Sequence, residues 1–180
     1  IDTYKAEVAY RAVIAGATVI NDVWGLKKDP EIASIASENK VPLVLTHNQK
    51  TTDYTDIIPD IINGLKESIG IALERGVDIH QIVIDPGIGF GKTPEGNLEI
   101  LRRLDEFRLG IHRPVMVGTS RKSTIGLVTE VSVPDDRVEG TAATVALAIA
   151  KQVDMIRGHD VLQMRRVARM SDAIVRGWRD

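Results

Sequence analysis

The sequence lacks cysteine entirely, so it can form neither a disulfide bond nor a thiolate metal site. Aromatic residues account for only 4% of the chain, which argues against a surface that stacks nucleic-acid bases. No apolar run approaches the roughly 18 residues that a membrane-spanning helix requires. Basic and acidic residues nearly cancel, giving a net charge of −2. We therefore expect neither nucleic acid nor a membrane as a partner.

The residues that are present are typical of an ordinary globular protein. Hydrophobic side chains make up 43% of the 180 residues, which is enough for one domain over residues 1–180 with its own core. The chain opens with Ile1 and no recognisable leader, so we expect the natural N-terminus to lie upstream. The lack of cysteine fits a reducing compartment, and we expect a cytoplasmic protein.

Five short apolar runs predict β-strands that are buried on both faces. Their residues are apolar at consecutive rather than alternate positions, which is typical of a parallel sheet covered by helices. The runs are Ala17–Val23, Val41–His47, Gln81–Pro86, Pro114–Ser120 and Val153–His159. Ile1-Asp2 would be the tail of one further strand.

Longer amphipathic stretches alternate with these runs and predict helices. An Asp-Pro-Glu sequence at residue 29 and a Thr-Pro-Glu sequence at residue 93 are typical helix starts, and Gly76 is a typical stop. We expect Leu98, Leu101 and Leu104 to face the core, and the small apolar helix 139–150 to be buried all round. The expected helices cover 5–15, 56–75, 139–150 and 161–178, with two more starting at 29 and 93.

The alternation of strand and helix predicts an α/β fold, either a (β/α)₈ TIM barrel or a doubly wound sheet. Polar residues follow every predicted strand, and in a barrel the carboxyl ends of all strands face one active site. A doubly wound sheet would instead gather its ligands near one switch point. We therefore favour a TIM barrel that is incomplete at the N-terminus. A complete barrel needs roughly 250 residues, so this chain holds about five and a half βα units.

The segment Asp85–Lys92 (DPGIGFGK) follows the third predicted strand and is the first candidate for chemistry. It is not a P-loop, because Pro86 stands where that motif needs its first glycine. It is not a dinucleotide fingerprint either, because Lys92 stands where the third glycine belongs. The glycines permit a tight turn beside a flat ligand, and Asp85 would point into the barrel mouth. Alternatively, Asp85 only caps the following turn.

The segment Gly118–Ser123 (GTSRKS) follows the next predicted strand. Lys122 offers a positive charge and donors to a carbonyl oxygen or ring nitrogen, and the serines offer small donors. The nucleophile motif Ser-x-x-Lys does not fit, because Ser120 and Lys122 are separated by a single residue. The alternative is an anion-binding loop or a solvated turn.

The segment Arg157-Gly158-His159-Asp160 ends the last predicted strand. Arginine and histidine at alternate positions of an extended segment point the same way. Beside a helix N-terminus this pair suits an anion such as phosphate or pyrophosphate. The alternative is a salt bridge from Arg157 to Asp160 or Asp154.

Three other polar positions are less informative by themselves. The dipeptides Asp2-Thr3 and Asn21-Asp22 are equally compatible with helix N-caps. His47 follows a strand and has no second histidine nearby, so we expect a structural hydrogen bond rather than a metal ligand.

These motifs, and their order along the chain, resemble those of the dihydropteroate synthase family of pterin-binding TIM barrels. The similar segments span the whole chain, and the combination of DPGIGFGK with GTSRKS is highly specific. The matching segments are Ile1–Lys5, Gly16–Asp22, Asp85–Lys92, Gly118–Gly126, Arg137–Thr141 and Arg157–Val161.

The resemblance implies a transferase of folate biosynthesis, assisted by Mg²⁺ and targeted by sulfonamides. In that reaction 4-aminobenzoate displaces pyrophosphate from 7,8-dihydropterin-6-ylmethyl pyrophosphate, and pyrophosphate leaves first. By resemblance, the pterin-binding residues would be Asp2, Asn21, Asp85 and Lys122. The 4-aminobenzoate site would comprise Phe90, Lys122 and Ser123, and the pyrophosphate site Arg157 and His159. The catalytic residues would be Asp2, Lys122, Arg157 and His159.

Two departures from the family pattern bear on function. Thr46 stands in the segment Leu45–Gln49, where the family commonly has Met-His-Met, and it would alter one wall of the pterin pocket. The family's first two βα units, which carry a metal-coordinating Asn, have no counterpart in this chain, so we expect the metal ligand to lie upstream. We expect a homodimer through the last helices, and we expect the isolated 180 residues to fold poorly and be nearly inactive.

Three alternative functions remain open from the sequence. A methyltetrahydrofolate-binding methyltransferase barrel shares the pterin-recognising Asp and Asn, but its chemistry has no pyrophosphate for Arg157 and His159 to hold. A non-catalytic pterin-binding paralogue would keep the pocket without turnover. A phosphate-binding barrel of unrelated metabolism is the third.

Overall fold

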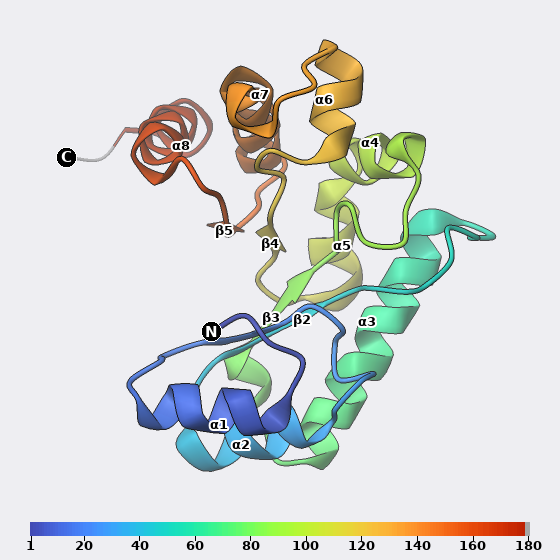
Figure 1. The fold of residues 1–180 in the computed structure, drawn as a ribbon, viewed down its shortest axis with the longest axis vertical. Coiled ribbons are helices and arrows are strands. Elements are labelled where there is room, and N and C mark those ends of the chain that lie inside the picture. Colours follow the sequence, from blue (N-terminus) through green and yellow to red (C-terminus); the bar gives the residue numbers. More distant parts are fainter. Residues whose placement is uncertain (179–180) are drawn as a thin grey trace.

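A computed structural model describes residues 1–178 and shows an α/β fold built on parallel strands (Figure 1). Strand β1 (Ile20–Asp22) pairs with β2 (Leu43–Thr46), and β2 pairs with β3 (Ile82–Asp85). Strand β4 (Met116–Val117) pairs with β5 (Met155–Ile156). Single parallel bridges connect β3 to β4 and the N-terminal residues to β1. Spatial order therefore follows chain order without reversal, as in the wall of a barrel.

Eight helices in the described residues lie outside this row of strands (Figure 1). They are α1 (Ala6–Ile14), α2 (Glu31–Asn39), α3 (Ile57–Glu74), α4 (Pro94–Arg102), α5 (Leu104–Ile111), α6 (Ser123–Thr129), α7 (Val138–Ala150) and α8 (Val161–Arg176). In Figure 1 the helices follow one another around an arc that begins with α1 and ends with α8. The N-terminal residues and β5 are the two ends of the row of strands. The predicted incomplete TIM barrel is confirmed.

Strand register separates an outer face from an inner face, because residues paired across parallel strands point to the same side. The outer set joins the main hydrophobic core under the helices: Ile20, Leu43, Leu45, Ile82, Ile84 and Val115. The inner set occupies the alternate positions: Asp2, Asn21, Val44, Thr46, Val83 and Asp85. By the same alternation Met116 and Met155 face inward, and Arg157 follows two residues after Met155.

The outer face fixes this register through burial. Ile61 and Leu65 of α3 and Phe107 of α5 are completely buried, as are the outer residues of β2 and β3. Burying each such side chain stabilises the fold by roughly 1.5–3 kcal/mol. A slip of one residue would move these groups to the inner face, so the same packing also holds the polar inner residues in place.

Most of the predicted helix boundaries are confirmed. Thr93 caps α4, since its Oγ1 accepts a hydrogen bond from the Gly96 N–H at 3.1 Å. Gly76 follows the end of α3 with a φ of 84°, a left-handed conformation that glycine adopts without strain. Asp29 Oδ1 accepts from the Glu31 N–H at 3.3 Å at the start of α2.

Several details of the predicted elements are wrong. Leu98 is 37% exposed instead of facing the core, and the predicted helix breaks after Arg102 into α4 and α5. Helix α7 is not buried all round, since Leu147 is 64% exposed. Helix α6 went unpredicted between the Lys122 loop and α7. Strand β5 is exposed at Met155, because it pairs only with β4 in the described structure.

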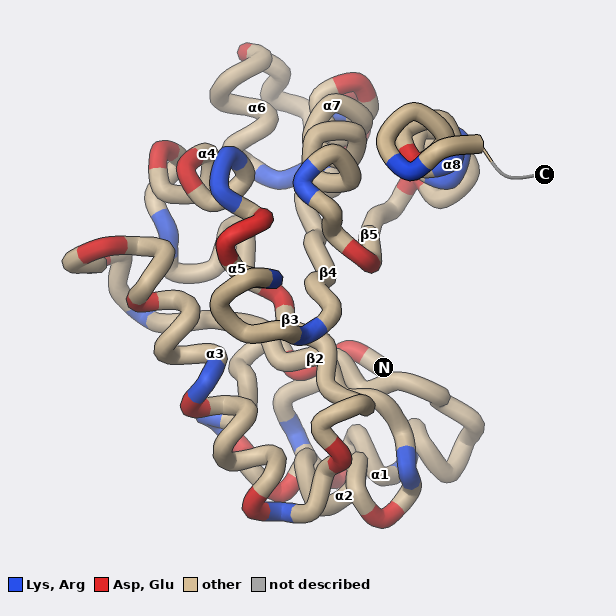
Figure 2. The backbone as a smooth tube through the Cα atoms, turned by 180° about the vertical axis from the view of Figure 1, so that it is seen from behind, with Lys and Arg blue, Asp and Glu red and all other residues tan. Residues whose placement is uncertain are grey.

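Charged residues of both signs are interspersed over the helices, as Figure 2 shows. None of the helices within residues 1–178 is both long enough and apolar enough to cross a membrane.

Candidate ligand site at the strand ends

The inner face carries a row of polar side chains near the carboxyl ends of the strands. Asp2 is paired with Asn21, and Thr46 is paired with Asp85, across neighbouring parallel strands. The two side chains of each pair therefore lie next to each other on this face. Arg157 follows β5 on the same side and donates to Asp2 Oδ2 at 2.7 Å, which joins the last strand to the first residues. The structure therefore brings Asp2, Asn21, Asp85 and Arg157 together, as predicted.

Asp85 is the most buried of the predicted site residues, with 7% of its surface exposed. Burial raises the pKa of its carboxyl group, while the Gly87 N–H and the nearby cations Lys122, Lys92 and Arg157 act in the opposite direction. Its Oδ1 accepts from the Gly87 N–H at 2.7 Å, so Asp85 does cap the turn that follows. Asp85 also lies on the inner face, and a carboxylate has acceptor sites to spare beyond one turn hydrogen bond.

The glycines after Asp85 let the loop pack directly on the end of β2. Gly87 and Gly91 have φ values of 74° and 56°, which favour glycine. A Cβ at Gly87 would lie 1.9 Å from the carbonyl oxygen of His47, and one at Gly91 would lie 2.2 Å from that of Gln49. The loop thus has no room for larger residues at these positions.

A buried lysine below this loop was missed by the sequence analysis. The Lys92 ammonium group contacts His47 Nδ1 at 3.2 Å and donates to the carbonyl oxygens of His47 at 3.3 Å and Phe90 at 2.8 Å. Burial lowers the pKa of Lys92 to about 7, although the Asp85 carboxylate raises it. Its place at the end of the glycine-rich loop was the only signal in the sequence.

His47 has the structural hydrogen bond that the sequence predicted. Burial, reinforced by Lys92 and Lys27, lowers the pKa of His47 to about 3, so the ring is neutral at pH 7. A neutral ring with unprotonated Nδ1 accepts from the Lys92 ammonium group. His47 and Lys92 together tie the end of β2 to the loop after β3.

Lys122 reaches from the β4–α6 loop to the loop after Asp85. Its ammonium group donates to the Ile88 carbonyl oxygen and lies 4.7 Å from the centre of the Phe90 ring. Burial lowers the pKa of Lys122, and Asp85 raises it. The Asp85 carboxylate and the Lys122 ammonium group therefore lie close enough to influence each other. Ser123 is exposed at the first residue of α6 and belongs to the same loop.

The alternative salt bridges of Arg157 are not formed. Asp160 pairs with Arg121 at 2.7 Å, and Asp154 pairs with Arg108 at 3.0 Å. Arg157 itself is more than half exposed and pairs only with Asp2 among the described residues. Its guanidinium group thus keeps donors free for a ligand at the mouth.

His159 lies two residues after Arg157 and is held by the β4–α6 loop. Its Nδ1 lies 3.0 Å from Ser120 Oγ, and its backbone N–H donates to the same oxygen at 3.1 Å. His159 is exposed, and its Nε2 makes no hydrogen bond in the described part of the chain. In the two dipeptides the Asn21 amide donates to Asp2 Oδ2 at 3.0 Å. The second residues do cap the backbone that follows, since Thr3 Oγ1 accepts from the Lys5 N–H at 3.1 Å and the Asp22 carboxylate accepts from two N–H groups of the next turn.

Two side-chain atoms on the inner face are buried without a hydrogen-bond partner in residues 1–178. They are Asn21 Oδ1 and Thr46 Oγ1. Buried polar atoms are nearly always paired, so such exceptions call for a partner outside the chain or a solvent molecule. Both belong to the row of residues that includes Asp85.

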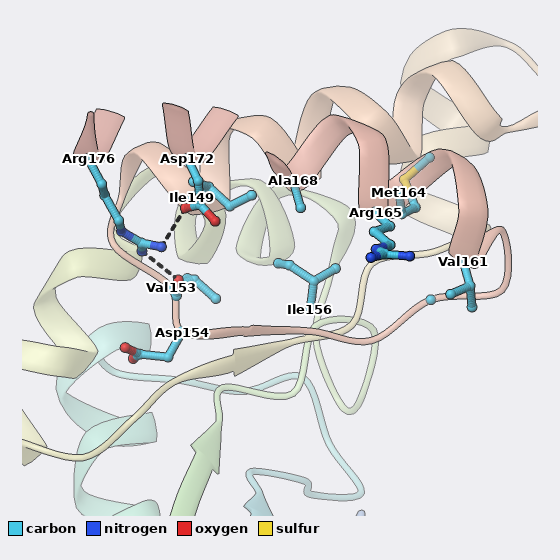
Figure 3. A pocket seen from close by; sticks show the side chains of 11 residues that line it. Ile149, Val153, Asp154, Ile156, Val161, Met164, Arg165, Ala168, Asp172 and Arg176 are labelled. Atoms are coloured by element: carbon cyan, nitrogen blue, oxygen red, sulfur yellow. Dashed lines mark hydrogen bonds and ion pairs between the residues drawn. The ribbon is translucent and has the colours of Figure 1, made fainter. Parts of the chain in front are cut away.

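A hollow lies away from this site, between β5 and α8 (Figure 3). It measures about 270 Å³ and is lined by residues that include Ile156, Met164 and Ala168, with the Arg176–Asp172 ion pair at its rim. None of the predicted site residues lines it. Among residues 1–178, no group of three or more His, Asp or Glu could hold a metal ion.

Fold and site together define a parallel α/β barrel wall whose polar side chains gather at the strand ends, an arrangement suited to a flat, hydrogen-bonding ligand. The family model of the pterin binding enzymes matches residues 1–159. The chain belongs to the pterin binding enzyme family.

Individual relatives agree with this assignment. The chain is 50% identical over 175 residues to dihydropteroate synthase of Bacillus subtilis, covering 97% of this chain and 61% of that protein. The structure of the Clostridium difficile enzyme, determined in the presence of pteroic acid, superimposes with a TM-score of 0.94 at 48% identity, over 98% of this chain and 66% of that one.

A third similar protein is Xanthomonas albilineans dihydropteroate synthase with 4-aminobenzoic acid, at a TM-score of 0.91 and 35% identity. That match covers 96% of this chain and 63% of the Xanthomonas chain. The chain therefore spans less than two thirds of the length of the Bacillus and Xanthomonas relatives.

Proposed function

We propose that the protein carrying this chain is a dihydropteroate synthase. The amine nitrogen of 4-aminobenzoate bonds to the methylene carbon of 7,8-dihydropterin-6-ylmethyl pyrophosphate. The carbon–oxygen bond to pyrophosphate breaks, pyrophosphate keeps the electron pair, and the nitrogen loses a proton. The products are 7,8-dihydropteroate and pyrophosphate. The observation that carries this proposal is the buried Asp85 carboxylate at the end of β3, with the cations Lys122 and Arg157 near it.

The pterin half of the proposal rests on donor and acceptor patterns. A pterin presents an amino group beside a ring N–H, and a carboxylate accepts from both at once with charge assistance. Asp85 supplies that carboxylate, and the unpaired Asn21 Oδ1 supplies an acceptor to another edge of the ring. Lys122 supplies donors for the pterin carbonyl side. The similar Clostridium structure, obtained with pteroic acid, supports this arrangement.

The leaving pyrophosphate would be held by Arg157 and His159. Its negative charge grows as the carbon–oxygen bond breaks, so fixed donors stabilise the transition state more than the ground state. Arg157 already pairs with Asp2, whose carboxylate would stabilise the cationic pterin methylene group left behind. Asp2 and Arg157 thus contribute charge placement rather than proton abstraction.

The 4-aminobenzoate would enter beside Phe90, Lys122 and Ser123. The Phe90 ring lies against the Lys122 ammonium group, so one side of this region is aromatic and the other is cationic. This combination suits a benzene ring that carries a carboxylate. The similarity to the Xanthomonas protein with 4-aminobenzoic acid supports the placement.

Mg²⁺ and a homodimer complete the proposal. Residues 1–178 offer no cluster fit to hold a metal, so we derive no step through Mg²⁺ and expect its protein ligand elsewhere. For the dimer, α8 exposes Leu162, Met170 and Ile174, each more than half accessible. Exposed apolar side chains on one helix favour an interface between copies.

The test is 4-aminobenzoate-dependent release of pyrophosphate by the purified full-length protein. We expect one pyrophosphate and one 7,8-dihydropteroate per turnover, with loss of activity on chelation of Mg²⁺. Pyrophosphate release that 4-aminobenzoate does not accelerate, with no 7,8-dihydropteroate formed in its presence, would contradict a transferase. Tight pterin binding without any turnover would favour the non-catalytic paralogue, and methyl transfer to a corrinoid would favour the methyltransferase.

A further inference from the structure

Asn97 of α4 has a buried amide group that joins two separate loops of the candidate site. The residue is 3% exposed. Its Oδ1 accepts a hydrogen bond from the Gly89 N–H at 2.7 Å, and its Nδ2 donates to Thr124 Oγ1 at 3.0 Å. Gly89 lies in the glycine-rich loop after β3, and Thr124 is the second residue of α6, which follows β4. One side chain therefore links the ends of two neighbouring strand–helix units.

The residues next to these two contacts are those expected to bind 4-aminobenzoate. Phe90 directly follows Gly89, and Lys122 and Ser123 directly precede Thr124. The Lys122 ammonium group lies 4.7 Å from the centre of the Phe90 ring. Asn97 thus connects the loop that carries Phe90 to the start of the helix that carries Ser123, without belonging to either.

Packing alone would not favour an amide at position 97. A buried amide costs free energy unless its polar atoms are hydrogen-bonded, and an apolar side chain of similar size avoids that cost. Ile100, one turn further along α4, is completely buried and apolar. A hydrogen bond restrains distance and direction more narrowly than an apolar contact does. What the amide adds over a leucine is therefore a fixed spacing between its two partners.

Asn97 is itself held firmly enough to set such a spacing. It lies at the end of the first turn of α4, which begins with the Thr93 cap and with Pro94 as the first helical residue. Helix α4 also packs against α3, α6 and α7. A side chain on a packed, capped helix positions its partners more precisely than one on a loop.

The other two contacts of the Phe90 segment cannot do the same. Lys122 donates to the Ile88 carbonyl oxygen, but Lys122 is expected to contact both substrates, so that bond competes with the ligands. Lys92 donates to the Phe90 carbonyl oxygen at 2.8 Å and ties the loop to the end of β2 rather than to α6. Asn97 is too buried to contact a substrate, so its link does not depend on whether one is bound.

We propose that Asn97 is a positioning residue that sets the spacing between Phe90 and the Lys122–Ser123 pair, and thereby the affinity for 4-aminobenzoate. The inference rests on the proposed function. Asp85 is held by its pairing in β3 and not by Asn97, so pterin binding depends little on this link. Loss of the link raises the KM for 4-aminobenzoate and leaves kcat and the Kd for the pterin nearly unchanged.

The experiment compares Asn97→Ala, Thr124→Val and Thr124→Ser with the wild type in the full-length protein. We expect the KM for 4-aminobenzoate to rise about tenfold in Asn97→Ala and about fivefold in Thr124→Val, which removes one of the two hydrogen bonds. Thr124→Ser keeps the hydroxyl group and should stay within about twofold of the wild type. The double variant Asn97→Ala/Thr124→Val should be no worse than Asn97→Ala, because both changes break the same link.

Calorimetric titration with 6-hydroxymethylpterin separates positioning from a loss of folded protein. Its stoichiometry counts the folded sites, and its Kd should stay within about twofold of the wild type in all variants. The matched control is Asn39→Ala, which removes an amide that donates to the Ile35 carbonyl oxygen at 2.9 Å at the end of α2, where β2 has not yet begun. It should leave the KM for 4-aminobenzoate unchanged.

Two results would overturn the inference while the proposed function stands. One is a wild-type KM for 4-aminobenzoate in the folded fraction of Asn97→Ala and Thr124→Val, because Asn97 then serves stability alone. The other is a pterin Kd that rises as much as this KM, because Asn97 then supports the whole site without selectivity. If Asn97→Ala does not fold, the near-isosteric Thr124→Val decides. A wild type that forms no 7,8-dihydropteroate refutes the proposed function itself.

Discussion

At the scale of single residues, Asp85 is the centre of the site. We predict that Asp85→Asn weakens binding of 6-hydroxymethylpterin by about 30-fold, roughly 2 kcal/mol, because an amide replaces the charge-assisted acceptor pair. The cations around Asp85 are then left without their carboxylate partner. Calorimetric titration measures the change.

Glu67→Gln is the control for this substitution, since Glu67 is exposed on α3 and loses the same charge. It should bind the pterin as the wild type does. Equal affinities of the Asn and wild-type proteins would show that Asp85 serves only the turn at Gly87.

Because His47 is neutral in the fold, we predict that the stability of the protein falls as the pH is lowered. Its pKa is about 3 in the fold and near 6.5 in the unfolded chain. Between these values the unfolded chain takes up a proton that the fold excludes. His47 therefore stabilises the fold fully above pH 6.5, and this contribution is lost as the pH falls toward 3, by up to about 1.4 kcal/mol per pH unit.

Replacing His47 by asparagine isolates this effect, because the amide oxygen can replace Nδ1 as the acceptor for Lys92. The difference in unfolding free energy between wild type and His47→Asn should shrink as the pH falls from 6.5 to 4, as measured by urea titration. A difference that stays constant over this range would mean that His47 is protonated in the fold.

The positions of the site residues could be predicted from the order of strands along the chain. The contacts that hold these residues in place could not. Asp85, Lys122 and Arg157 come directly after apolar runs, and a barrel sends all such residues to one end. The contact of Lys92 with His47 joins positions 45 residues apart. Such a contact depends on how one loop packs on another, which no local pattern encodes.

At the scale of elements, one arginine holds the connection between α6 and α7. The Arg137 guanidinium group donates to the carbonyl oxygens of Arg121 at 2.8 Å, Val131 at 3.0 Å and Ser132 at 2.6 Å. We predict that Arg137→Met lowers the free energy of unfolding by about 2–3 kcal/mol, because three carbonyl groups lose a charged donor. Urea unfolding measures this loss, and limited proteolysis should find new cleavage between residues 121 and 137.

Arg169→Met on the exposed surface of α8 is the matched control and should change stability by less than about 0.5 kcal/mol. Equal stabilities of the two variants would show that Arg137 does not hold this connection.

The order and kind of elements could be predicted from the sequence, but several boundaries could not. Every predicted strand is present, yet β4 and β5 are only two residues long. The polar and glycine-rich residues that follow each of them do not continue the strand pairing. Helix α6 is only seven residues long, too short for a clear periodic pattern. Leu98 and Leu147 match an inward pattern but are exposed, since exposure is decided by neighbouring helices.

At the scale of the whole molecule, the two ends of the row of strands bear on how the isolated chain behaves. In the described structure β5 pairs only with β4, and the Asp2 segment pairs only with β1. Unpaired strand edges promote association. We predict that residues 1–180 expressed alone aggregate at micromolar concentration and turn over at least about a hundredfold more slowly than the full-length protein. Sedimentation velocity and the pyrophosphate assay test both parts, and a monomeric, fully active chain would contradict the prediction.

The central claim is that side chains from successive strand ends enclose one pterin. The most direct measurement is a crystal structure of the full-length protein with 6-hydroxymethylpterin. The account predicts that the amino and ring N–H groups of the ligand lie within hydrogen-bond distance of the Asp85 carboxylate, with Asp2, Asn21 and Lys122 around the same ring. A pterin bound elsewhere, such as the hollow between β5 and α8, with the Asp85 pocket filled only by water, would contradict it.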